Sequence, residues 1–121
     1  LHEALKAAET LAGEGIAARV IDLYSIKPID EATLLEAARE TGNLVTVEDH
    51  WPEGGLGDAV LEVFADRSDD AERPRVARLA VSHMPGSATP SEQLADAGID
   101  ADHIADAARR LVGTPVAAGA K

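Results

Sequence analysis

Three carboxylates and one imidazole follow directly after an apolar run, at the place where a strand would end. The run is 44–47, and the polar side chains behind it are Glu48, Asp49, His50 and Glu53. Such groups can bind divalent metals or act as an acid/base pair. Adjacent residues of an extended chain point to opposite sides, so Glu48 and Asp49 are not expected to chelate one ion together. The pattern favours surface hydrogen bonding, or contact with another chain or domain, over a metal site.

Three glycines, Gly54, Gly55 and Gly57, open the helix that is predicted next. The amino end of a helix attracts anions through free N–H groups and the helix dipole. This turn lacks both the Gly-Lys-Ser/Thr ending of a P-loop and the glycine spacing of a dinucleotide site, and the neighbouring carboxylates would repel a phosphate. Tight turning and close packing of the helix on the sheet is the favoured interpretation, with a small-anion site as the alternative. Trp51, the sole indole, either packs within the loop or contacts a partner.

A second polar stretch, 82–87, contains Ser82 and His83 side by side. Side chains adjacent in sequence diverge, and no acid is placed to orient the histidine, so a catalytic triad is not indicated. Ser91 is expected to cap the helix that follows.

Apolar periodicity predicts the elements that would position these residues. Helices are expected over 1–12, 31–42, 55–65, 91–97 and 101–112, and strands over 16–23, 44–48 and 76–81. Asp30 and Asp100 are the expected N-caps of two of these helices. Alternation of strands and helices over short connections indicates parallel crossovers and an α/β sandwich of three layers, with a mainly parallel sheet between helices.

The length fits one domain, predicted over 1–113, with a surface loop over 66–74 and a disordered tail over 114–121. The leading helix has no strand before it from which to cross over. We therefore expect the first strand of the sheet to be missing, and the chain to be part of a longer polypeptide.

The amino-acid composition of the chain limits the classes of molecule that it is expected to bind. The chain is 45% hydrophobic, carries a formal net charge of −11 and has no cysteine. Such negative charge argues against nucleic acid and anionic membranes as partners. No stretch approaches the ~20 apolar residues that span a bilayer, and cytoplasm is the default location.

Three separate stretches resemble the C-terminal domain of transketolases. The first is VIDLYSIKPID, from Val20 to Asp30, and the second joins VTVEDH, from Val45, to EGGLG, which ends at Gly57. The third comprises PGS, PSEQL and GID, between Pro85 and Asp100. The resemblance extends from about residue 1 to residue 112. 1-Deoxyxylulose-5-phosphate synthases and the beta subunits of 2-oxo acid dehydrogenases share these features more loosely and remain alternatives.

The resemblance implies a five-stranded sheet with one antiparallel strand, inside an enzyme of the pentose phosphate pathway that moves a two-carbon ketol unit between sugar phosphates. That enzyme uses thiamine diphosphate and a divalent cation, Mg or Ca. The Gly-Asp-Gly cofactor signature of the family belongs to another domain, and Gly57-Asp58-Ala59 is not such a signature. No catalytic, cofactor-binding or metal residue is therefore expected here. The implied role is to support a homodimer, with Glu48 to Gly57 contacting another domain or subunit.

Overall fold

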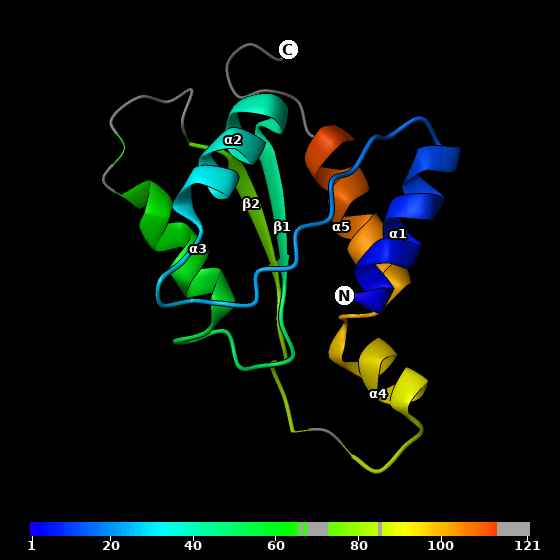
Figure 1. Ribbon diagram of the computed structural model, residues 1–121. Coiled ribbons are helices and arrows are strands. Elements are labelled where there is room, and N and C mark those ends of the chain that lie inside the picture. Colours follow the sequence, from blue (N-terminus) through cyan, green and yellow to red (C-terminus); the bar gives the residue numbers. More distant parts are fainter. Residues whose placement is uncertain (66, 68–72, 85, 114–121) are drawn as a thin grey trace.

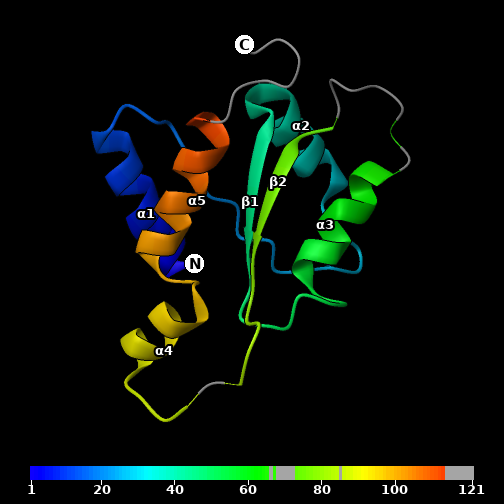
Figure 2. The same ribbon diagram turned by 180° about the vertical axis from the view of Figure 1, so that it is seen from behind.

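The computed structural model describes residues 1–65, 67, 73–84 and 86–113. In chain order the elements are α1 (His2–Gly13), α2 (Glu31–Thr41), β1 (Asn43–Val47), α3 (Leu56–Ala65), β2 (Arg75–Leu79), α4 (Pro90–Ala97) and α5 (Ala101–Gly113). The two strands stand between two pairs of helices (Figure 1). One face of the sheet is covered by α2 and α3, and the other by α5, against which α1 packs; Figure 2 shows the same layers from behind. The three-layer α/β arrangement is confirmed.

Local chemistry accounts for the helix ends. The Asp30 carboxylate accepts a hydrogen bond from the Thr33 N–H at 3.2 Å, and Gly42 ends the same helix with a φ of +71°. A left-handed residue at this position suits glycine. Asp100 caps α5 through the His103 N–H at 3.1 Å. The two N-caps predicted at aspartates are thus confirmed.

One predicted cap is displaced. Helix α4 begins at Pro90, and its N-cap is Thr89, which forms a reciprocal capping box with Glu92. The prediction of Ser91 as the cap is therefore wrong by two positions. Proline is favoured at the first helical position because its missing N–H is not needed there.

The sheet contains β1 and β2, paired in parallel with Asn43 opposite Arg75 and Val47 opposite Leu79. Side chains of the strands feed two apolar clusters. One cluster joins Leu11 of α1 and Ile104 of α5 to Val47, and the other joins α2 and α3. Burial on both faces is the usual condition for a parallel sheet, because its crossover helices cover both sides.

The strand predicted over 16–23 is not a strand. Within the described residues, 17–23 form no backbone hydrogen bond with another segment, and the segment crosses on the β1 side of the sheet (Figure 1). A cavity of about 1160 Å³ lies along it and is also lined by Leu44, Val45 and Val47 of β1. The valine- and isoleucine-rich sequence favours an extended conformation, but a strand also needs a neighbouring edge within hydrogen-bonding distance, and here that edge is absent.

Two further predictions fall partly or wholly outside the described residues. These are the surface loop over 66–74 and the tail over 114–121. The extent of the domain, 1–113, stays a prediction.

Candidate functional site

The site lies where β1 turns into α3, and Glu48 is its centre. The Glu48 N–H donates to the Leu79 carbonyl at 3.0 Å, which continues the sheet pairing one residue past β1. The Glu48 side chain is 4% exposed and turns toward the amino end of α3. Its two carboxylate oxygens accept hydrogen bonds from the Leu56 N–H at 2.8 Å and the Gly57 N–H at 2.7 Å. A buried carboxylate therefore satisfies two of the free N–H groups at the start of this helix.

A second set of contacts ties the same turn to β2. The Gly54 N–H donates to the Asp58 carboxylate at 2.6 Å, and the Arg78 guanidinium pairs with that carboxylate at 2.9 Å. Arg78 also donates to the Pro52 carbonyl at 2.6 Å. The hydrogen bond from Gly54, together with the charge of Arg78, lowers the pKa of Asp58 below its ordinary value. Arg78 thus holds both ends of the turn from the neighbouring strand.

At two of the three glycines, other side chains lie so close to the backbone that a Cβ atom would clash with them. A Cβ atom added at Gly55 would lie 1.9 Å from Glu48 Oε1, and one added at Gly57 would lie 2.4 Å from Arg78 Nε. Gly54 has a φ of +74°, which side chains rarely adopt. Glycine therefore lets the turn close around the buried carboxylate and the guanidinium, as the packing interpretation of these residues predicts.

The remaining residues of the predicted cluster face outward. Asp49 and Glu53 are exposed, and Trp51 is 45% exposed. His50 Nδ1 lies 2.6 Å from the Trp51 carbonyl, and because a carbonyl only accepts, the proton is on Nδ1. The same nitrogen is 3.8 Å from Glu48 Oε1. The turn thus combines a buried polar interior with an exposed acidic and aromatic rim.

This geometry does not fit a diphosphate or a divalent cation. The N–H groups that would hold a phosphate are those of Leu56 and Gly57, and Glu48 already occupies them. Asp58 takes the Gly54 N–H in the same way. In the described part of the chain, no three histidine, aspartate or glutamate side chains are grouped to hold a metal. The arrangement is suited to fixing the shape of a surface turn.

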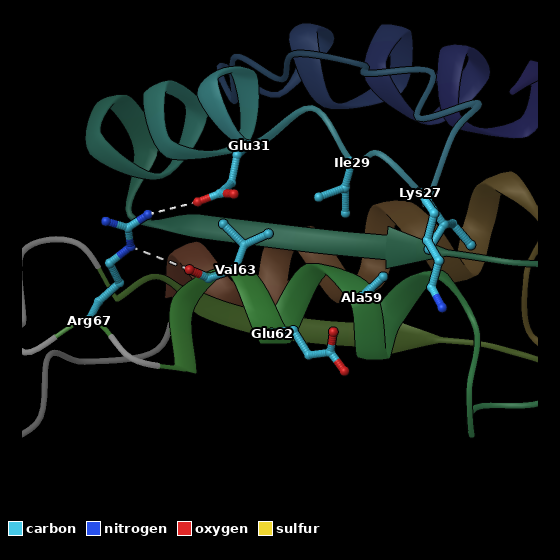
Figure 3. Close-up of a pocket in the computed structure, with 8 residues that line it drawn as sticks. Lys27, Ile29, Glu31, Ala59, Glu62, Val63 and Arg67 are labelled. Atoms are coloured by element: carbon cyan, nitrogen blue, oxygen red, sulfur yellow. Dashed lines mark hydrogen bonds and ion pairs between the residues drawn. The ribbon is translucent and has the colours of Figure 1, made fainter.

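A second hollow, of about 430 Å³, lies between the 26–29 loop and α3 (Figure 3). It is lined by the apolar side chains of Ile29, Ala59 and Val63 and by the charged side chains of Lys27, Glu31, Glu62 and Arg67. Arg67 closes one end by donating to Glu31 at 3.0 Å and to the Val63 carbonyl at 3.3 Å. Arg67 is therefore already hydrogen-bonded within the protein. The side chains that line this hollow are not arranged as a catalytic site.

His83, in the polar stretch 82–87, contacts helix α4. The expectation that no acid would contact this histidine is wrong, because His83 Nε2 lies 2.8 Å from the Asp96 carboxylate of α4, a residue 13 positions along the chain. This pair links the connection after β2 to α4, and Ser82 takes no part in it.

Among the described residues, no helix is long and apolar enough to span a membrane.

Sequence reasoning missed Arg78. It stands in the middle of a strand, between Ala77 and Leu79, and its Nε is buried without a hydrogen-bond partner. A charged residue inside a strand covered on both faces was the available signal, because burying a charge is unfavourable unless it is paired.

The chain is similar in sequence to a known protein family and to several of its members. The family described as "Transketolase, C-terminal domain" matches residues 1–104. The transketolase of Rattus norvegicus is 48% identical over 113 residues, which cover 93% of this chain and 18% of the rat protein. Transketolase-like protein 1 of Bos taurus is 46% identical, with the same coverage of both chains. The chain thus spans about a fifth of the length of these relatives.

A solved structure has the same arrangement. It is described as "Split gene transketolase, inactive beta4 tetramer", is 40% identical and superposes with a TM-score of 0.82. The match covers 93% of this chain and 36% of that one. At this identity and score, both the fold and the kinship of the two chains are supported.

Proposed function

Because the chain belongs to the transketolase C-terminal domain family, we propose that it is the non-catalytic C-terminal domain of a transketolase. The parent enzyme would transfer a two-carbon ketol unit between sugar phosphates in the pentose phosphate pathway. It would use thiamine diphosphate and a divalent cation held by its other domains. Its location would be the cytoplasm. The names of the relatives favour this reaction over deoxyxylulose phosphate synthesis or oxo acid decarboxylation.

The observation that carries the proposal is the buried carboxylate of Glu48. In a glycine-rich turn that could have offered free N–H groups to a phosphate, the protein places its own anion 2.7 and 2.8 Å from those groups. This supports the proposal that the turn belongs to the scaffold, because the N–H groups that a cofactor phosphate would need are already bonded to Glu48. This favours a domain that shapes and supports an enzyme over a free-standing anion-binding module.

Exposed apolar side chains indicate which surface would meet the rest of the enzyme. Tyr24 is 93% exposed, Met84 is 79% exposed and Trp51 is 45% exposed. Met84 and Trp51 lie in the connections that leave β2 and β1, and Tyr24 follows the extended segment. Aromatic residues and methionine are enriched in protein interfaces. We infer that these connections, including the rim of the Glu48 to Gly57 turn, contact another domain or the partner subunit of a homodimer.

A direct test measures binding and catalysis by residues 1–121 alone. Titration with thiamine diphosphate and Mg²⁺, followed through Trp51 fluorescence and by calorimetry, should show no binding, and ketol transfer should be undetectable. Binding at micromolar concentration, or turnover, would refute the proposal. Inorganic phosphate in a parallel titration tests the anion-binding alternative, since saturable binding to the α3 amino end would support that function instead.

A chimera tests the supporting role. Residues 1–113 of this chain would replace the matching segment of the rat transketolase. The chimera should be active and dimeric, and Trp51→Ala in it should weaken the dimer while leaving the fold of the isolated chain intact. Loss of activity with an unchanged dimer would contradict the assignment.

A further inference from the structure

Two polar side-chain atoms are buried at neighbouring positions of the sheet. Thr46 of β1 is 7% exposed, and it stands opposite Arg78 of β2 in the parallel register. Within the described part of the chain, neither Thr46 Oγ1 nor Arg78 Nε has a hydrogen-bond partner. Buried polar groups are normally paired, because an unpaired one loses its hydrogen bonds to water without replacement. These two atoms therefore need a partner that the protein's own groups do not supply.

Both side chains lie on the face of the sheet that is covered by the amino end of α3. Residues paired in register on neighbouring strands point to the same side of a sheet. The contacts of Arg78 identify that side, since its guanidinium pairs with Asp58 at 2.9 Å and a Cβ atom at Gly57 would clash with Nε. Paired strands are about 4.8 Å apart. One small molecule with hydrogen bonds of about 2.8 Å on each side fits between two such side chains.

The surrounding charges define the chemistry of that molecule. An anion is disfavoured because the buried carboxylate of Glu48, two residues after Thr46 and on the same face, belongs to the same turn. A cation is disfavoured because Arg78 Nε carries a hydrogen and only donates. The ligand is therefore neutral, accepts from Nε–H and forms a hydrogen bond with the threonine hydroxyl. Water is the smallest molecule with these properties, and internal water commonly satisfies buried polar groups.

We propose that an internal water molecule binds between β1 and β2, where it accepts a hydrogen bond from Arg78 Nε–H and forms a second one with Thr46 Oγ1. The water holds the stem of the arginine, while Nη2 at its tip donates to the Pro52 carbonyl at 2.6 Å and pairs with Asp58 at 2.9 Å. It thereby positions the side chain that fixes the turn between β1 and α3. This inference concerns the interior of the sheet and does not depend on the assigned function.

The direct test compares crystal structures of residues 1–121 and of the variant Thr46→Val, at a resolution that shows ordered water. The parent chain should show a density peak about 2.6–3.2 Å from both Thr46 Oγ1 and Arg78 Nε, and Thr46→Val should lack it. Thr46→Ser keeps the hydroxyl and is the matched control, so the peak should remain there. A direct hydrogen bond between the two side chains, or a parent chain without the peak, would overturn the proposal.

Urea unfolding distinguishes a bound water from two dry, unpaired atoms without a crystal. Threonine and valine have nearly the same shape, so Thr46→Val chiefly removes the hydroxyl. If the hydroxyl binds the water, its loss leaves Arg78 Nε unpaired, and the urea midpoint should fall by about 0.5 M. If the site is dry, the variant removes an unpaired polar group and the midpoint should rise. A midpoint equal to or above that of the parent chain would refute the water site.

Discussion

Replacement of Glu48 by glutamine tests the centre of the turn. Glu48→Gln keeps the size of the side chain and one acceptor oxygen, but it places an NH₂ group against an N–H donor of Leu56 or Gly57, at distances that are now 2.8 and 2.7 Å. A hydrogen bond to a charged group contributes roughly 1.5–3 kcal/mol. The interaction of the carboxylate with the helix dipole adds roughly 0.3–1 kcal/mol.

We therefore expect Glu48→Gln to lower the free energy of unfolding by about 2–4 kcal/mol. Loss of one of the two hydrogen bonds and of the dipole interaction sets the lower figure. Repulsion between the glutamine NH₂ and the backbone N–H, at a site with little access to water, increases the loss of stability toward the upper figure. The change is large compared with a total stability of about 5–15 kcal/mol for a domain.

Urea unfolding followed by circular dichroism measures the difference. With a slope of about 2 kcal/mol per molar urea, in the middle of the usual range, the midpoint should fall by about 1–2 M. Asp49→Asn is the matched control, because Asp49 is adjacent, acidic and exposed, and it should change stability by less than about 0.5 kcal/mol. If the two variants had the same midpoint, or if Glu48→Gln were as stable as the parent chain, the proposed capping role would be wrong.

Three further predictions concern the glycine turn, an acidic side chain and a helix cap. Gly55→Ala places a Cβ against the buried Glu48 carboxylate and should lower the free energy of unfolding by about 1–3 kcal/mol. At Gly13 an added Cβ meets nothing within 4 Å, so Gly13→Ala should leave the free energy of unfolding unchanged or raise it by about 0.5–1 kcal/mol. The pKa of Asp58 is lowered in the folded state, so its contribution is present above about pH 4 and is lost as the pH falls further; Asp58→Asn should flatten the acid side of a plot of urea midpoint against pH, and an unchanged slope would contradict this. Thr89→Ala should destabilise the chain by about 1 kcal/mol and fray α4 in amide exchange, while Ser91→Ala should do neither; the reverse order would restore Ser91 as the cap.

Much of the fold could be predicted from local patterns. The helices at α2, α3 and α5 and the parallel pair β1 and β2 follow from apolar spacing and from caps at Asp30 and Asp100. These signals are local, because a cap bonds to a residue three positions away and a helical stripe repeats every three or four.

The site was located from the sequence, but its internal contacts were not. The succession of strand, acidic residues and glycines marked the turn, and the packing role of its glycines was the favoured interpretation. The inward direction of Glu48 and the part played by Arg78 depend on how β1 lies beside β2. Arg78 reaches Pro52 and Asp58 across that pairing, and no spacing along the chain encodes such a contact.

The sequence by itself determined the family resemblance, most element positions and the place of the turn, because propensity and short-range hydrogen bonds act between near neighbours. Only the tertiary structure decided that Glu48 fills the α3 amino end and that residues 17–23 run along a cavity without pairing to another described segment. Valine and isoleucine favour an extended backbone, but strand formation also needs a second backbone at hydrogen-bonding distance. That condition belongs to the assembled sheet and not to the segment itself.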